Sequence, residues 1–248
     1  MSEKLKFDMT QMYYRQPFKV NDRITIYQPS VGDIIEFGEN DFYNSVLNPF
    51  VTNSTSYRVM LWDNGIDWNK TSDFELFAML YKSISSTELL FHDFSFAGYD
   101  PYTQTIDGKS SVVLWNKDVD DIITEQDYVV MSQYIRTLFN IFPKAEKVKG
   151  KILKEEIINQ DRIKQRENEK QEHSPFLLPL ISSCMNHPGF KYRIDDLKDL
   201  GIFAFMDSVQ RLQIYESSIA LLHGAYGGFV DSSKLDKNEM NFMRSIEK

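Results

Sequence analysis

The sequence predicts a mostly helical α+β protein, with a small antiparallel sheet in an N-terminal domain and an all-helical C-terminal domain. Apolar residues recur at helical spacing through most of the chain. An Asp-Gly pair at 107–108 separates two β-prone runs, which predicts a hairpin. Residues 144–173 are highly charged and contain no aromatic residue. We therefore expect an α+β domain at 1–143, a charged helical spacer at 144–173 and an all-helical domain at 174–248.

The beginning of the chain is expected to form a polar arm, residues 1–17, that is ordered only by contact. Residues 23–27 alternate polar and apolar side chains, as a half-buried strand does. Ser30 is placed to cap a helix that begins at the next residue. We expect Gly38 to interrupt this helix and Pro49 to end its continuation.

Two further helices are predicted before the sheet. The first covers 56–62 and ends at the turn-forming sequence Asp-Asn-Gly at 63–65. The second opens with a capping box, in which the Ser72 hydroxyl and the Glu75 carboxylate bind each other's free backbone amides. Its buried face is expected to consist of Phe74, Phe77, Ala78 and Tyr81.

The antiparallel sheet is predicted within residues 88–116, where the apolar period changes. Leu90, His92, Phe94 and Phe96 alternate with their neighbours, which indicates a strand. The runs 103–106 and 111–115 flank the Asp-Gly turn and form the hairpin. We expect the strand at 23–27 to join this sheet.

A helix is predicted from about Gln126 to Phe142, and Pro143 ends it. The spacer that follows has only a short apolar stripe, formed by Ile152, Leu153, Ile157 and Ile158. Residues 165–173 are entirely polar. This composition favours an exposed helix or a semi-rigid spacer.

The remaining chain is expected to be helical. Ser174 and Pro175 are suited to the N-cap and the first position of a helix. The expected inward face of that helix consists of Phe176, Leu177, Leu180, Ile181 and Met185. A long helix should run through 202–223 and end at the glycines that begin with Gly224, and a last amphipathic helix should cover 236–246.

Composition limits the classes of function. The net charge of -8 argues against broad nucleic-acid binding, which needs lysines and arginines to replace phosphate counterions. No stretch approaches the roughly 20 apolar residues that cross a bilayer, and the first residues lack the apolar core of a signal peptide. The single cysteine, Cys184, excludes an internal disulfide and is typical of a reducing compartment. We therefore expect the protein to stay in the cytoplasm where it is made.

Reactive side chains are few and scattered. Cys184 and His187 are spaced so that both could reach one edge of a helix, but no orienting group is evident nearby. A small buried cysteine is the favoured interpretation.

The acidic run at 116–127 resembles a calcium-binding loop in its density of carboxylates. Asp121 stands where the sharp turn requires glycine, and Asp127 stands where a bidentate glutamate closes such a loop. Capping and solvated acids explain the run better. Residues 108–110, Gly-Lys-Ser, lack the upstream glycine of a phosphate-binding loop. No catalytic residue, cofactor site or metal site is therefore predicted.

Aromatic residues are the main surplus of this chain. Its 13 Tyr, 18 Phe and 3 Trp exceed what two small domains are expected to bury. Tyrosine and tryptophan are favoured at protein interfaces. We therefore predict a protein-binding surface formed by Tyr13, Tyr14, Phe18, Trp62 and Trp68.

Four segments resemble a protein family encoded by long-tailed bacteriophages and prophages of Gram-positive bacteria. In that family the corresponding blocks recur in the same order and span nearly the whole chain. Its members are similar to proteins known as tail assembly chaperones. The segments are 26–35 with 42–43, then 73–77, then 122–128 and finally the glycine- and aromatic-rich block at 224–231.

The resemblance implies a non-enzymatic assembly factor without a cofactor. Such a protein would act in the host bacterial cytoplasm, bind the long helical tape measure protein and help tail-tube subunits polymerise around it. Association of the protein with itself stays open. Two alternatives also stay open: a structural component of the virion, such as a connector or tail-associated protein, and an enzyme whose site is assembled from distant residues.

Overall fold

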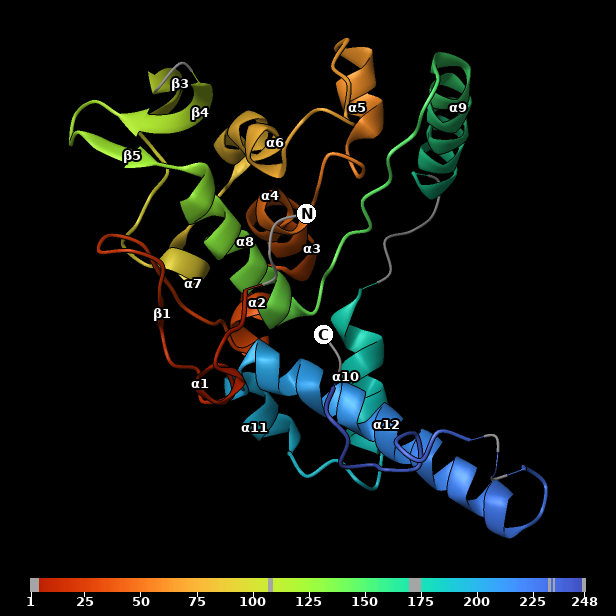
Figure 1. Cartoon of the computed structure of the whole chain (residues 1–248). Coiled ribbons are helices and arrows are strands. Elements are labelled where there is room, and N and C mark those ends of the chain that lie inside the picture. The colour runs from red at the N-terminus through yellow and green to blue at the C-terminus, as the bar shows by residue number, and fades with distance from the viewer. Residues whose placement is uncertain (1–4, 107–108, 170–174, 232, 234, 247–248) are drawn as a thin grey trace.

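The computed structural model describes residues 5–106, 109–169, 175–231, 233 and 235–246 (Figure 1). Helices account for most of the regular structure in these ranges, and two small antiparallel sheets complete it. The expected α+β class with mostly helical content is therefore confirmed. Within these ranges, none of the helices combines the length and the apolar character that crossing a membrane demands.

The larger sheet has three antiparallel strands in the order β3-β4-β5. Its members are β3 (Tyr99–Ile106), β4 (Lys109–Asn116) and β5 (Asp121–Ile123). Ile106 pairs with Lys109, so two residues connect β3 and β4, as the predicted hairpin requires. The Asp-Gly pair itself, at 107–108, lies outside the described residues.

The predicted strand at 23–27 does not join this sheet. The part of it that forms a strand, β2 (Thr25–Ile26), pairs instead with β1 (Phe18–Lys19) in a separate two-stranded sheet. A short strand pairs with a neighbour in sequence because closing a short loop costs little entropy. The two sheets are linked through side chains, since Arg23 Nη1 lies 2.6 Å from the Asp121 carboxylate.

Short helical segments form most of the first half of the chain. They are α1 (Met9–Tyr13), α2 (Val31–Phe37), α3 (Glu39–Asp41), the π-helical η1 (Phe42–Leu47), α4 (Asn48–Val51), α5 (Arg58–Asp63), α6 (Asp73–Leu80), the 3₁₀ turn η2 (Tyr81–Ser83) and α7 (Glu88–Phe91). The predicted caps at Ser30 and Ser72 are both present, each as a capping box. Gly38 separates α2 from α3 at a φ of 100°.

Two expectations in this half are wrong. The polar arm is partly helical, because the Asp8 carboxylate accepts hydrogen bonds from the first free amides of α1. Pro49 does not end the helical stretch, because it lies in the first turn of α4, where a proline has no helical hydrogen bond to lose.

The alternating residues at 90–96 do not form a strand either. α7 covers the beginning of this segment, and a loop leads from it to β3. Leu90 and Phe91 are adjacent in sequence and both buried, which a strand with one solvent face cannot achieve. His92 follows in a left-handed conformation, at a φ of 49°, and ends α7.

The long helix of the first half, α8 (Glu125–Phe139), begins at a third capping box, formed by Thr124 and Asp127. It ends before the predicted Phe142, because Asn140 adopts the left-handed conformation at a φ of 54°. A segment without regular structure then leads to α9 (Lys151–Asn168).

The C-terminal helices are α10 (Leu177–Asn186), α11 (Ile194–Asp199) and α12 (Ile202–Tyr226). Pro175 precedes α10 instead of opening it, and the predicted cap Ser174 lies outside the described residues. α12 continues through Gly224 and ends at Gly227. The predicted helix at 236–246 is absent from the described part of that segment, which forms turns along α12.

One large hydrophobic cluster joins the beginning and the end of the chain. α8 packs against α12, and α11 packs against α2. The buried side chains of this cluster include Ile135 from α8, Leu177 from α10 and Phe205 from α12. A second, smaller cluster lies between α5 and α9. The division into two domains and a spacer stays a prediction about which parts fold independently.

Candidate protein-binding surfaces

The C-terminal end of α12 reverses the chain in a turn rich in glycine. The Gly227 amide donates to the His223 carbonyl at 2.9 Å, as the last helical bond. Gly228 follows at a φ of 73°, a conformation that glycine adopts without a steric penalty. The amides of Phe229 and Val230 then both donate to the Gly224 carbonyl, at 2.9 and 3.1 Å.

Two of these glycines lie close to side chains of the same turn. A Cβ atom at Gly224 would lie 2.8 Å from Val230 Cγ2. A Cβ atom at Gly227 would lie 2.8 Å from the Phe229 ring and 3.0 Å from the His223 carbonyl oxygen. The local sequence therefore specifies this turn, which we call the aromatic tip and define as residues 224–231.

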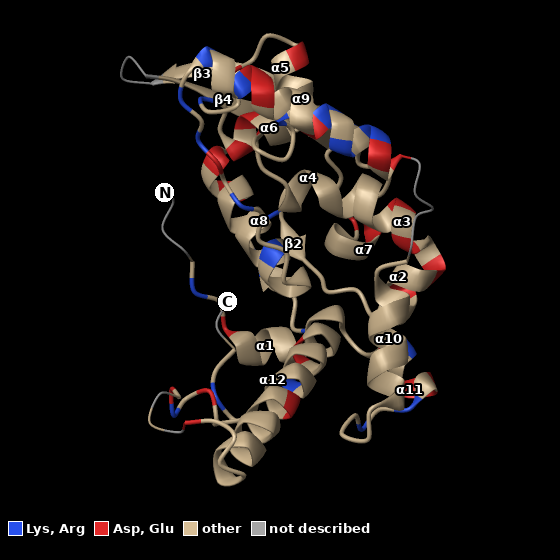
Figure 2. Cartoon of the chain, turned by 90° about the vertical axis from the view of Figure 1, so that its right-hand side faces the viewer, with Lys and Arg blue, Asp and Glu red and all other residues tan. Residues whose placement is uncertain are grey.

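The aromatic tip displays two rings to solvent. Tyr226 is 88% exposed and Phe229 is 90% exposed, more than the other large hydrophobic side chains in the described chain. The tip lies where α12 extends away from the sheets and from α9 (Figure 1, Figure 2). Burial of such rings against another molecule would be favourable, because each removes a large apolar area from water.

The C-terminal segment lies along α12 beside the tip. The Arg211 guanidinium donates to the Arg244 carbonyl at 2.6 Å, and the Ser218 hydroxyl donates to the Glu239 carbonyl at 2.8 Å. The Phe242 ring meets the Tyr215 ring edge to face at 5.8 Å. These contacts hold the segment in turns and explain why its amphipathic pattern does not form a helix.

The five aromatic residues predicted to bind protein lie in three separate places. Tyr13 and Tyr14, at the end of α1, are exposed and line a cavity of about 440 Å³ beside Phe203 of α12. Burial and a hydrogen bond with Tyr192 raise the pKa of Tyr13 to about 12. This phenol is therefore neutral at physiological pH.

The other three predicted residues are less accessible. The Phe18 ring is stacked on the Tyr134 ring at 4.2 Å and belongs to the edge of the large cluster. Trp62 is partly buried at the end of α5, 5.9 Å from Trp68. Trp68 is only 1% exposed, so it contributes nothing to the surface of the molecule in this conformation.

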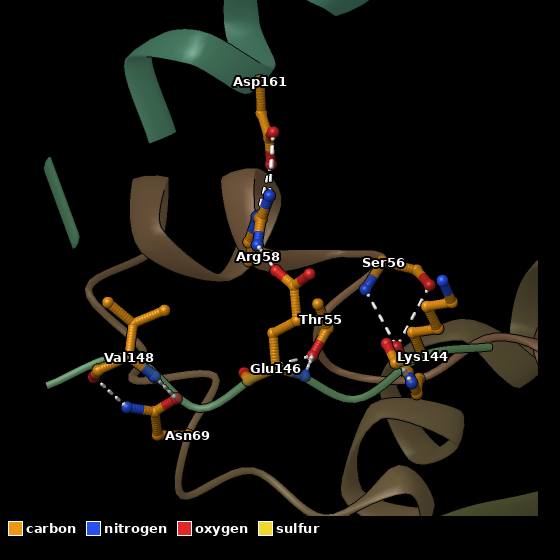
Figure 3. A network of polar contacts seen from close by, with 9 residues as sticks. Thr55, Ser56, Arg58, Asn69, Lys144, Glu146, Val148 and Asp161 are labelled. Carbon is orange, nitrogen blue, oxygen red and sulfur yellow. Dashed lines mark hydrogen bonds and ion pairs between the residues drawn. The ribbon is translucent and has the colours of Figure 1, made fainter. Parts of the chain in front are cut away.

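The charged segment 144–168, which we call the strap, lies against α5 and the loop after it (Figure 3). The Asn53 amide donates to the carbonyls of Pro143 and Lys144, at 3.4 and 3.2 Å. Farther along, the Asn69 side chain exchanges two hydrogen bonds with the Val148 backbone, at 2.7 and 3.2 Å. Side-chain hydrogen bonds therefore hold the first part of the strap to the fold, while most of α9 is exposed to solvent.

Arg58 forms the centre of the ionic contacts in the strap (Figure 3). Its Nε and Nη2 atoms bind both oxygens of Asp161, the latter at 2.9 Å, while Nη1 lies 2.8 Å from the Glu146 carboxylate. The hydrogen bond to Asp161 raises the pKa of Arg58. At the other end, Lys154 Nζ lies 2.7 Å from the Asp67 carboxylate and lowers its pKa.

The residues considered for chemistry have structural roles. Burial raises the pKa of the Cys184 thiol, which disfavours the reactive thiolate. His187 Nε2 lies 2.9 Å from the Glu216 carboxylate, and its Nδ1 accepts the Gly189 amide at 2.9 Å. The imidazole is thus held by partners other than the thiol.

The acidic run at 116–127 is also explained by the fold. Asn116 accepts the Asp118 amide, and Asp121 binds Arg23 and the Tyr99 hydroxyl. Asp127 caps α8. Among the described residues there is no group of three or more histidine, cysteine or acidic side chains that could hold a metal ion.

A polar cleft of about 1100 Å³ lies between α7, η2 and the start of β3. Four of its charged side chains form two pairs: Lys82 with Asp100 at 2.8 Å, and Arg15 with Asp33 at 3.7 Å. The His92 ring is stacked on the Tyr27 ring at 3.5 Å. This arrangement suits a hydrated polar cleft more than a site with a reactive group.

Comparison of the chain with protein-family models, curated proteins and solved structures finds no match. Of the surfaces described, the aromatic tip has the rings with the highest exposed fractions, Tyr226 at 88% and Phe229 at 90%. Sequence reasoning did not name Tyr226 or Phe229 as binding residues. The glycines beside these two residues were the signal in the sequence that could have indicated them. Glycines predict a turn, and side chains in a turn are usually exposed.

Proposed function

We propose that the protein is a non-enzymatic assembly factor of the tail assembly chaperone kind, and that it binds another polypeptide through the aromatic tip. Its clients would be the tape measure protein and the tail-tube subunits, in the host bacterial cytoplasm. The exposure of Tyr226 and Phe229 is the observation that carries this proposal. Exposed apolar surface of this kind is typical of interaction sites.

The four segments that resemble the phage family differ in what they contribute to the fold. The first three contain or adjoin the capping boxes of α2, α6 and α8, so helix initiation accounts for them. The fourth is the aromatic tip, whose two rings contribute little to the core. Binding to a partner is the physical account that we propose for this fourth segment.

The chemistry of the tip suits an apolar helical client. A long helical protein exposes apolar faces until it assembles, and such faces are prone to aggregate. Rings displayed by a hydrogen-bonded turn can cover part of such a face, and the turn is already formed before binding. This form of chaperoning requires neither a nucleotide nor a metal ion.

Co-expression with the tape measure protein tests the proposal. We expect the wild-type chain to keep the client soluble. The double substitution Tyr226→Ser and Phe229→Ser should lower the amount of soluble client by about tenfold or more, because interface energy is concentrated in a few aromatic residues. The matched control is Tyr102→Ser, which removes an exposed ring from β3. Equal solubility with the tip variant and with the control would contradict the proposal.

Mass spectrometry of purified phage particles separates a chaperone from a structural component of the virion. A chaperone leaves before the particle is complete, so we expect the protein to be absent from mature particles. Stoichiometric copies in the particle would instead identify it as a connector or tail-associated protein.

A further inference from the structure

The strap helix α9 contacts α5 and the loop after it through one narrow face of the helix. The side chains on this face are Lys154, Ile157, Ile158, Asp161 and Arg162, at helical spacing of three and four residues. Ile158 is 0% exposed and is the only buried residue of α9. Ile152, two residues before this face, is 83% exposed, and side chains of both charges occupy much of the remaining surface of α9 beside the exposed Leu153 and Ile163 (Figure 2).

The surface beneath α9 complements that face. Val59, Leu61 and Trp68 surround Ile158 in the smaller hydrophobic cluster. This cluster is separate from the large core, to which α9 contributes no buried side chain. We call this surface, formed by α5 with residues 66–68 and Leu76, the α5 groove.

Charges at the rim of the α5 groove fix the direction of the helix that it holds. Asp67 pairs with Lys154 at 2.7 Å, and Lys154 Nζ also lies 5.1 Å from the centre of the Trp68 ring. About two turns farther along α9, Arg58 binds Asp161 through two nitrogens, and Asp63 binds Arg162. The rim of the groove therefore presents Asp67, Arg58 and Asp63. Each of them pairs with a residue of opposite charge on α9.

The contact has the character of a protein–protein interface more than of a core. One side chain of the helix is fully buried, and charged pairs surround it. A cavity of about 410 Å³ remains beside Trp62 and the first turn of α9. The described residues at 142–150 form no helix or strand, so the segment that leads into α9 is held by side-chain contacts with Asn53 and Asn69 and not by a regular backbone ladder.

We infer that the α5 groove is a binding site for an amphipathic helix of a client, and that α9 occupies it until the client arrives. The client helix carries a cation, branched aliphatic residues three and four positions after it, an acid seven positions after it and a second cation eight positions after it. This inference rests on the proposed function. It adds a second client site, with Trp62 and Trp68 in its wall, and assigns α9 an autoinhibitory role.

A synthetic peptide with the sequence of residues 151–168 tests the inference without any client. The peptide carries a dye, and its binding to the full chain is measured by fluorescence anisotropy. In the wild-type chain α9 competes with the peptide. In the variant Ile158→Asp the resident helix no longer fits the groove, so the peptide should bind at least about tenfold more tightly, because the binding-competent fraction rises.

Two controls make this comparison specific. The chain variant Ile152→Asp changes an exposed residue of the same helix and should bind the peptide as weakly as the wild type does. A peptide with Ile158→Asp should bind neither chain. The variant Asp161→Arg releases α9 through its charge and keeps its apolar contact, so it replaces Ile158→Asp if that chain fails to fold.

A charge exchange tests the direction of binding. The substitution Arg58→Glu in the released chain should weaken its binding of the wild-type peptide by at least about tenfold. A peptide with Asp161→Arg should bind this variant more tightly than the wild-type peptide does and so recover part of the lost affinity. Equal binding of the peptide to the wild-type and released chains would overturn the inference. Dimers of the wild-type chain, detected by light scattering, would also overturn it, because the unmodified α9 of a second copy would then be the occupant.

The peptide assay and the client assay fail independently. If the peptide binds the released chain but the client is not kept soluble, the groove stands as a helix-binding site and the proposed function fails. If the client is kept soluble and the peptide binds neither chain, the proposed function stands and the groove is only part of the fold.

Discussion

Arg58 and Asp67 hold the strap through opposite ends of the α5 groove. The guanidinium of Arg58 is largely buried and serves two carboxylates, Asp161 and Glu146. A planar fork that binds both oxygens of one carboxylate gives a stronger contact than a single exposed pair. Removing it leaves Asp161 without its main partner in a site that is mostly shielded from water.

The substitution Arg58→Ala is expected to lower the free energy of unfolding by about 1–3 kcal/mol. Urea denaturation followed by circular dichroism measures this change. The matched control is Lys19→Ala, which breaks an exposed pair with Asp22 and should change stability by less than about 0.5 kcal/mol. An Arg58→Ala effect as small as that of the control would show that the strap is not held by this contact.

The pair of Asp67 and Lys154 makes the strap sensitive to acid. Lys154 lowers the pKa of Asp67 in the folded chain, so the carboxylate stabilises the fold above its unfolded pKa of about 4. This stability is lost as the pH falls through the lower, folded-state pKa. We expect the urea concentration at the midpoint of unfolding to decrease when the pH is lowered below about 4. The substitution Asp67→Asn should remove part of this decrease. An identical pH profile in Asp67→Asn would contradict this assignment.

At the scale of elements, the three capping boxes set where α2, α6 and α8 begin. In each, a hydroxyl and a carboxylate satisfy amides that the helix itself cannot satisfy. Such contacts involve residues three positions apart, so they are readable from the sequence without knowledge of the fold. The cap at Ser72 and the hairpin between β3 and β4 were predicted correctly for this reason.

Loss of one cap should have a moderate effect. Ser72→Ala is expected to lower the free energy of unfolding by about 1 kcal/mol, which corresponds to a fall in Tm of about 2–4 °C for a chain of this length. Scanning calorimetry measures the shift. Ser217→Ala, at an exposed position within α12, is the control and should shift Tm by less than about 2 °C.

Elements that depend on distant contacts were not predictable in the same way. The alternation at 90–96 indicated a strand, but burial of two adjacent residues in the large cluster favours α7. The amphipathic run at 236–246 indicated a helix, but Arg211 and Ser218 of α12 bind its backbone in turns. In both segments tertiary contacts outweigh a weak local preference.

At the scale of the whole molecule, the sequence revealed the surplus of aromatic residues but not their locations. Trp68 and Phe18 were predicted to lie on the binding surface, but both pack against other rings. Tyr226 and Phe229 are the most exposed, because the glycine turn places them beyond the reach of the core. Exposure depends on the path of the entire chain, so residue type alone could not distinguish these two groups.

The molecule has two separate surfaces for which we propose binding, the aromatic tip and the α5 groove. The aromatic tip is open, whereas the α5 groove is covered by α9. A client that meets the tip first would then compete with α9 for the groove. This order follows from exposure alone, and it makes the tip the surface on which recognition of the client depends.

Hydrogen–deuterium exchange of the protein, alone and with the co-purified tape measure protein, tests the central claim most directly. We expect the client to slow exchange in the last turn of α12 and in residues 224–231, because bound rings stabilise the turn that displays them. The β3–β4 hairpin should exchange at the same rate in both states. Unchanged exchange at 224–231 in a complex that demonstrably forms would contradict the claim that the aromatic tip binds the client.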